Sequence, residues 1–328
     1  MTDAVMVVDN LVKHFPVSSG QYGGRTIGHI RAVDGVSFSI KEGTTLALVG
    51  ESGCGKTTTA RLILRLTRPT SGSVTLEGRE VHSLKRRELR WFRTNVQAVF
   101  QDPWASLSPR MRVRNIVAEA LVVNRRLSRD EVRERVGETL EKVGMERWHG
   151  DLFPHEFSGG QRQRIALAGA LITDPSLLVL DEPVSALDVS VQAQVLNLLK
   201  DIQRDLNTTY LMISHNLATV QYVAHQAAVM YMGRIVEQGP TDQVFESPQH
   251  PYTQGLLAAD LPTHPGDRGP RLEIIGELPS PLDPPSGCRF RTRCPHVMDV
   301  CTTTPETVKV GAEHLVRCHL HTSPAGSL

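Results

Sequence analysis

The spacing of apolar positions near the N-terminus predicts an α/β core. Gly35–Ile40 alternates apolar and polar residues as a strand does, and Thr44–Val49 is a short apolar run that ends in glycines. Thr57–Leu66 then carries apolar residues at helical spacing. An apolar strand, a glycine loop and a helix in this order are typical of α/β proteins that bind phosphate groups.

The pattern changes twice in the rest of the chain. From about Trp104 to Gly150 the sequence is charged and helix-favouring, with apolar residues three and four apart, which predicts an inserted helical subdomain. After Ser158, apolar strands at Leu177–Leu180 and Tyr210–Ile213 are each followed by a helix-like segment, which predicts a parallel sheet. Beyond about Ser247 the chain is rich in proline, glycine, histidine and cysteine, and PSPLDPPSG forms a stiff linker.

Composition excludes several classes of protein. The 328 residues are enough to bury the hydrophobic core of a globular protein. With 36 basic and 35 acidic residues the net charge is near zero, so overall charge does not indicate a surface that binds nucleic acid or an anionic membrane. The start MTDAVMVVDN has no secretory pattern. No run reaches the roughly 20 apolar residues that a spanning helix requires. We therefore expect the protein to stay in the cytoplasm, with other chains supplying any membrane span.

Residues 50–57, GESGCGKT, follow an apolar strand and open a helix, which is the context of a phosphate loop. The glycines allow positive φ angles and let backbone N–H groups surround an anion. Lys56 is expected to reach the β and γ phosphates, the Thr57 hydroxyl to bind Mg²⁺, and Thr58 to support the phosphates. The alternative, a glycine-rich turn with a surface lysine, fits this context poorly. The predicted nucleotide contacts here are Gly50, Ser52, Gly53, Cys54, Gly55, Lys56, Thr57 and Thr58, with Cys54 needed only for its backbone.

A second motif, LLVLDE at Leu177–Glu182, carries two carboxylates out of the C-terminal end of an apolar strand. Ligands bind at such ends in open α/β sheets. Asp181 is expected to hold Mg²⁺, directly or through water, and Glu182 to act as the general base toward the attacking water. Without the phosphate loop, the same pair could serve only as a helix N-cap.

The segment SGGQ, Ser158–Gln161, precedes this strand and resembles the signature motif of ATP-binding-cassette proteins. In that family two cassettes pack head to tail, so that the signature of one covers the ATP on the phosphate loop of the other. The resemblance implies further roles. Gln101 matches the glutamine that senses the γ-phosphate, binds Mg²⁺ and couples to the membrane subunits. His215 matches the switch histidine, Phe15 the aromatic that stacks on adenine, and the SALD segment at 185–188 the loop that crosses the dimer interface.

Longer strings narrow the resemblance. VKHFPV, RAVDGVSFSI, FQDPWASLSPRM, PHEFSGGQRQRIA and HPYTQGLL look like the ATPases of oligopeptide and dipeptide importers, particularly the second of the two non-identical ATPases in such systems. Phe157 before SGGQ is usual in this branch, whereas Gly169 stands where the family commonly has arginine.

The resemblance implies the whole arrangement that we expect. The fold class is α/β, a phosphate-loop (RecA-like) core with an antiparallel β subdomain. Residues 1–247 form the nucleotide-binding domain, with the helical subdomain at about 102–172, and residues 248–328 form a C-terminal extension. The cofactors are ATP and Mg²⁺. The partners are a second cassette ATPase, two membrane permease subunits and an extracytoplasmic solute-binding protein, with the chain peripheral on the cytoplasmic face of the membrane.

Two rival functions compete with a peptide importer. A soluble cassette ATPase of nucleic-acid maintenance or translation would carry paired cassettes or long coiled-coil insertions, and this chain has neither. A regulator without turnover is disfavoured because Lys56, Asp181, Glu182 and His215 are all present.

Four cysteines gather in the C-terminal extension. Structural disulfides are not expected in a cytoplasmic protein, and zinc sites use tighter CxxC pairs, which are absent here. A four-iron four-sulfur cluster also takes four thiolates and often has a proline after a ligand, as Pro295 follows Cys294. The family resemblance favours this cluster, while zinc and four reduced cysteines that pack a small extension stay open. The predicted ligands are Cys288, Cys294, Cys301 and Cys318.

Overall fold

The computed structural model describes residues 4–19, 26–101, 107–124, 127–260, 274 and 276–322. The described chain forms two compact units. The first unit comprises Met1–Val7, Ser39–Thr45 and Thr75–Ile213, and the second comprises Val8–Phe38, Leu46–Val74 and Ser214–Leu328. The predicted C-terminal extension, residues 248–328, therefore falls in the same unit as Leu46–Val74, which contains the glycine loop.

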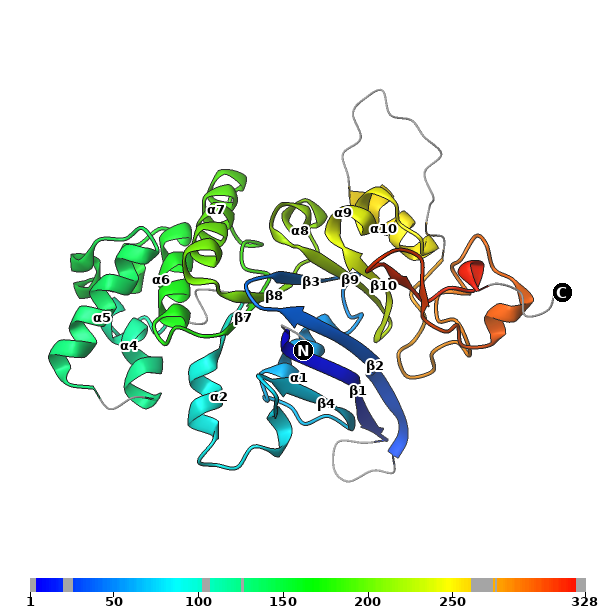
Figure 1. Cartoon of the computed structure of the whole chain (residues 1–328), viewed down its shortest axis with the longest axis horizontal. Coiled ribbons are helices and arrows are strands. Elements are labelled where there is room, and N and C mark those ends of the chain that lie inside the picture. The colour runs from blue at the N-terminus through cyan, green and yellow to red at the C-terminus, as the bar shows by residue number, and fades with distance from the viewer. Residues whose placement is uncertain are drawn as a thin grey trace. The chain divides into compact units, whose positions relative to one another are not determined.

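In the second unit a sheet is built on β3 (Thr45–Val49), whose residues are all buried. From Leu46 to Val49 this strand runs parallel to β9 (Gln226–Tyr231), which pairs antiparallel with β10 (Arg234–Pro240). The C-terminal extension continues the sheet, because β12 (Leu315–Val316) pairs with β10 and β11 (Val308–Lys309) pairs with β12. Figure 1 labels β3, β9 and β10 of this sheet.

The helix α1 (Lys56–Ile63) follows β3, as the sequence predicts, but it ends before the predicted Leu66. Arg65 takes a left-handed conformation with φ 57°, which terminates the helix. The same unit contains α8 (Leu217–Val223), α9 (Thr241–Glu246) and α10 (Pro251–Asp260).

Parallel strands form the core of the first unit, in the order β8 (Thr209–Ile213), β7 (Leu177–Asp181) and β6 (Val96–Val99). The predicted strands in this segment and the predicted parallel pairing are confirmed. Parallel strands that are buried on both faces are continuously apolar, and β8 is buried along its whole length. The helices α2 (Leu89–Asn95) and α7 (Val189–Leu206) belong to the same unit.

Three helices form the predicted helical insertion, namely α4 (Val113–Asn124), α5 (Arg129–Lys142) and α6 (Gly159–Leu171). They contact one another and lie together in Figure 1. Ser128 and Glu131 form a reciprocal capping box that starts α5, which explains why the charged segment becomes a helix there. Residues 102–106, at the predicted start of this insertion, lie outside the described residues.

A second sheet is formed near the N-terminus, where β2 (Thr26–Lys41), β1 (Ala4–Ser18) and β4 (Ser71–Leu76) are neighbours in that order and β5 (Arg79–Glu80) pairs antiparallel with β4. Short 3₁₀ turns complete the structure at Val81–Ser83, Arg147–Asp151, Pro154–Glu156, Asp299–Thr302 and His319–His321. Within the described residues, every helix is too short or too polar to cross a membrane.

Candidate functional site

The glycine loop between β3 and α1 has a backbone conformation that favours glycine at three points. Gly50, Gly53 and Gly55 have φ angles of 143°, 79° and 115°. A Cβ on Gly50 would lie 2.2 Å from the carbonyl oxygen of Met230, and one on Gly55 would lie 2.3 Å from that of Ala32. A Cβ on Gly53 would meet nothing within 4 Å. The loop therefore packs closely against neighbouring backbone at Gly50 and Gly55, whereas Gly53 has free space beside it.

Lys56 lies across this loop. Its side chain is buried, and Nζ donates hydrogen bonds of 2.6 Å to the Gly50 carbonyl and 3.1 Å to the Glu51 carbonyl. The helix α1 begins at this lysine, so the ammonium charge and the positive end of the helix dipole coincide. Such an arrangement of amides, helix N-terminus and ammonium suits a polyphosphate.

The other side chains of the loop differ in their exposure to solvent. Ser52 and Thr57 are exposed, so their polar groups are open to a ligand, while Thr58 is half-buried. Cys54 is buried, and burial raises the pKa of its thiol. That only the backbone of Cys54 is used stays a prediction.

Two predicted residues of the first unit are in direct contact. Gln101 Nε2 donates a 2.6 Å hydrogen bond to Glu182 Oε2. Glu182 directly follows Asp181, the last residue of β7, and takes a left-handed φ of 51°. Its backbone N–H donates a 2.9 Å hydrogen bond to the Ile213 carbonyl at the end of β8. The turn after β7 thus holds Glu182 at the carboxyl ends of two parallel strands.

The signature segment begins α6 with a capping box. Ser158 Oγ accepts from the Gln161 N–H at 3.3 Å, and Gln161 Oε1 accepts from the Ser158 N–H at 3.0 Å. Ser158 and Gly159 are exposed, whereas a Cβ on Gly160 would lie 2.3 Å from Cγ1 of Val191. The segment therefore presents an exposed helix N-terminus, and Gly160 allows the close approach of α7.

The remaining predicted residues lie in the second unit. His215 is exposed in the turn before α8, where the Asn216 side chain accepts from the Thr219 N–H at 2.9 Å. Phe15 lies on β1 with 36% of its surface exposed, and the Lys13 ammonium stands 5.0 Å from its ring centre. The predicted site residues thus divide between the units: Phe15, the phosphate loop and His215 belong to the second, and Gln101, Ser158–Gln161, Asp181 and Glu182 belong to the first.

The four cysteines of the C-terminal extension line one small cavity of about 10 Å³, together with His250, His296 and His319. The Cys288 N–H donates a 3.0 Å hydrogen bond to the Cys301 carbonyl, which ties two of the cysteine segments together. Burial raises the pKa of Cys318 to about 11 and also raises those of Cys288 and Cys294, and the nearby thiols act in the same direction.

These thiols do not form a metal site as they stand. In the part of the chain that the structure describes, no three cysteine, histidine, aspartate or glutamate side chains are grouped closely enough to hold a metal ion. The structure therefore brings the four cysteines to one cavity but gives no support to the predicted iron–sulfur cluster.

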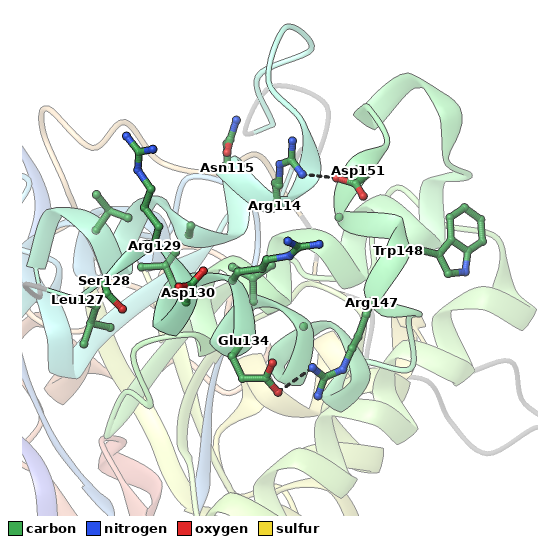
Figure 2. A pocket seen from close by; sticks show the side chains of 17 residues that line it. Arg114, Asn115, Leu127, Ser128, Arg129, Asp130, Glu134, Arg147, Trp148 and Asp151 are labelled. Atoms are coloured by element: carbon green, nitrogen blue, oxygen red, sulfur yellow. Dashed lines mark hydrogen bonds and ion pairs between the residues drawn. The ribbon is translucent and has the colours of Figure 1, made fainter.

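A larger cavity, of about 990 Å³, lies among α4, α5 and the turn at Arg147–Asp151. Figure 2 shows its charged lining, in which Arg114 pairs with Asp151 and Arg147 pairs with Glu134. None of the nucleotide-site residues predicted from the sequence lines this cavity. Size alone therefore does not identify the nucleotide site.

The sequence did not predict Tyr252 and Arg293, two residues outside the phosphate loop that hydrogen-bond to its Glu51. Glu51 is bound through its side chain by Arg293 and through its N–H by Tyr252, both from the C-terminal part of the chain. The available signal was Glu51 itself, because a carboxylate next to a phosphate-binding loop requires a compensating charge.

Comparison with known families gives two matches. A model described as "ABC transporter" matches residues 33–185, and a model described as "Oligopeptide/dipeptide transporter, C-terminal region" matches residues 236–301.

Sequence similarity to curated proteins extends over nearly the whole chain. The di/tripeptide transport ATP-binding protein DppF of Pseudomonas aeruginosa is 47% identical over 317 residues, which cover 97% of this chain and 98% of that protein. The oligopeptide transport ATP-binding protein AppF of Bacillus subtilis is 44% identical over 323 residues, which cover 97% and 98%. Among solved structures, cbiO1 of Clostridium perfringens, part of the ABC transporter complex cbiONQ, has a TM-score of 0.64 at 30% identity over 75% of this chain and 92% of its own. A dimeric cassette, MJ0796, in a post-hydrolysis state with ADP and phosphate has a TM-score of 0.63 at 26% identity over 72% and 98%.

Proposed function

This chain belongs to the ATP-binding-cassette family, among the ATP-binding subunits of oligopeptide and dipeptide transporters, and we propose that it powers the import of peptides across the cytoplasmic membrane. It is an ATPase with the α/β phosphate-loop fold of that family. The observation that carries the proposal is the match of residues 236–301 to the C-terminal region of peptide transporters, combined with similarity along nearly the whole chain.

The proposed chemistry assigns binding to one set of residues and bond cleavage to another. Lys56 and the amides of the phosphate loop bind the phosphates, and Phe15 stacks on adenine. Thr57, Gln101 and Asp181 would hold Mg²⁺. Glu182 accepts the proton of the attacking water, and Gln101 holds its carboxylate in place. The 2.6 Å bond between these two side chains supports this division, because a general base must be oriented before it acts.

Transport is proposed to follow from a cycle of dimerisation. The exposed Ser158–Gly159 end of α6 covers the ATP of a second cassette, and His215 contacts the γ-phosphate. Hydrolysis then separates the cassettes and resets two permease subunits, which receive the solute from an extracytoplasmic binding protein. In this proposal the second cassette is a non-identical ATPase, and the helical insertion at about 102–172 meets the permeases on the cytoplasmic side.

The extension over residues 248–328 is proposed as a structural module beyond the cassette domain of residues 1–247. We propose that its four cysteines bind a four-iron four-sulfur cluster, with zinc or no metal as the alternatives. The proposal rests on the gathering of four thiols around one cavity, and it requires the thiols to move closer and to lose their protons. A cluster would cross-link a segment with little regular secondary structure.

Reconstitution tests the transport function. The chain, its partner ATPase and its permeases are placed in proteoliposomes with binding protein outside, and uptake of labelled dipeptides and longer peptides is measured with and without internal ATP. ATP-dependent uptake of peptides is expected, and it should disappear in a complex that lacks this chain. An ATPase that is stimulated by nucleic acid and supports no peptide uptake would instead favour the rival soluble class.

A further inference from the structure

The phosphate loop is held by residues that come from the far end of the chain. Glu51, the second residue of the loop, accepts hydrogen bonds of 3.0 and 3.3 Å from the two terminal nitrogens of the Arg293 guanidinium. The backbone N–H of Glu51 donates a 2.9 Å hydrogen bond to the hydroxyl of Tyr252. All three residues belong to the second unit.

Arg293 is itself held in place. Its side chain is 9% exposed against 28% for Glu51, so the pair is shielded from solvent mainly on the arginine side. The guanidinium carbon stands 5.9 Å from the ring centre of Tyr231, and a 3.5 Å hydrogen bond runs to the Tyr231 hydroxyl. A bidentate arginine–carboxylate ion pair combines charge attraction with a fixed orientation of the two side chains.

An aromatic cluster anchors this arm of the extension. The rings of Tyr231, Tyr252 and Phe290 lie within 4.6 to 5.5 Å of one another, centre to centre, and all three side chains are fully buried. Phe290 lies two residues after Cys288 and three before Arg293. Burial of these rings therefore fixes the backbone from which Arg293 reaches Glu51.

We propose that Arg293 is a positioning residue for ATP binding, which neutralises Glu51 and holds the first turn of the phosphate loop. The Glu51 carbonyl accepts from Lys56 Nζ at 3.1 Å and from the Cys54 N–H at 3.2 Å, so a shift of Glu51 moves the groups that orient Lys56. An unpaired Glu51 carboxylate next to the cradle also repels the negatively charged triphosphate. Arg293 removes both effects. The inference rests on the proposed role of the loop as the phosphate site.

The experiment compares variants of the full chain, both alone and assembled with its transport partners. MgATP affinity is measured by calorimetry on the isolated chain, and KM and kcat by phosphate release from the complex. Arg293→Ala is expected to raise the Kd and KM for MgATP about tenfold, because a hydrogen-bonded charge is lost at the loop, while kcat changes less than about threefold. Arg291→Ala serves as the matched control, since Arg291 is a half-buried arginine of the same segment and its guanidinium bonds only Ser286 among the described residues.

A second substitution separates the positioning role from simple damage to the fold. Glu51→Gln removes the charge that Arg293 balances, so the double variant Arg293→Ala with Glu51→Gln is expected to recover an affinity within about threefold of the wild type. The Kd and KM of Arg293→Lys for MgATP should lie between those of the wild type and Arg293→Ala, because lysine keeps the positive charge but cannot bind the carboxylate in a bidentate way. An unchanged KM in Arg293→Ala, or a double variant no better than Arg293→Ala, overturns the inference.

Two further measurements make each outcome decisive. If Arg293→Ala does not fold, the lysine variant still has to show a raised KM with an unchanged kcat, and a wild-type KM in that variant rejects the proposal. Lys56→Ala tests the loop itself. Loss of MgATP binding in Lys56→Ala together with normal binding in Arg293→Ala rejects this inference alone, whereas normal binding in Lys56→Ala rejects the phosphate-loop assignment.

Discussion

Replacing Glu182 by glutamine isolates the chemical step from binding and folding. The amide has nearly the same shape as the carboxylate, so the left-handed turn and the backbone bond from Glu182 to Ile213 are kept. Gln101 can still donate to the amide oxygen at the place where it now meets Glu182 Oε2. What disappears is the negative charge that accepts a proton from water.

The size of the effect follows from these contacts. The bond between Gln101 and Glu182 is solvent-exposed, so its weakening should change the free energy of unfolding by less than about 1 kcal/mol. Loss of a general base lowers turnover by at least ~10²-fold, which corresponds to about 2.7 kcal/mol in the activation free energy. Chemistry is therefore expected to suffer far more than stability.

The assay measures three quantities on the same preparations. Steady-state phosphate release from the assembled complex gives kcat, titration with MgATP gives the Kd, and urea denaturation gives the free energy of unfolding. Glu119→Gln is the control, because Glu119 is an exposed glutamate on α4 in the same unit. Glu182→Gln should keep the wild-type Kd and accumulate an ATP-loaded cassette pair. A wild-type kcat in Glu182→Gln would refute the assignment of the base.

Other perturbations test the remaining parts of the proposal. Lys56→Ala should weaken MgATP binding itself, by at least about tenfold, in the calorimetric titration. Gln101→Ala should reduce peptide uptake per ATP hydrolysed in proteoliposomes while the MgATP Kd stays the same, and normal coupling would contradict the coupling role that the family resemblance implies. Anaerobic purification followed by iron, sulfide and zinc analysis should find about four irons per chain in the extension, whereas zinc alone supports the runner-up and a folded, metal-free extension rejects both. Burial lowers the pKa of the His250 imidazole to about 3. The stability that neutral His250 contributes is therefore present above the unfolded pKa of about 6.5 and is lost as the pH falls toward 3. His250→Asn, which keeps an acceptor for the Tyr252 N–H, should make the free energy of unfolding, measured by urea titration, decline less between about pH 7.5 and 5.

Local motifs were readable from the sequence because their geometry depends on near neighbours. The glycines of the phosphate loop occupy the positive φ angles that their spacing suggested, and α1 follows directly. The strand ending in Asp181 and the helix that begins after Ser158 were found for the same reason, since strand periodicity and a capping box each span only a few residues. Even so, the sequence placed the end of α1 at Leu66, because a left-handed Arg65 has no signature in residue type.

Tertiary packing alone decided which distant groups meet. The resemblance to a known family implied separate roles for Gln101 and Glu182, but their hydrogen bond spans 81 residues of sequence. The bond from Arg293 to Glu51 spans 242 residues and joins a cysteine-rich extension to the phosphate loop. In the same unit β12 pairs with β10, and Phe290 is buried against two tyrosines, a burial that apolar area and shape favour. Neither contact leaves a periodic trace along the chain, so the bond between this arginine and the loop could not be predicted from the sequence.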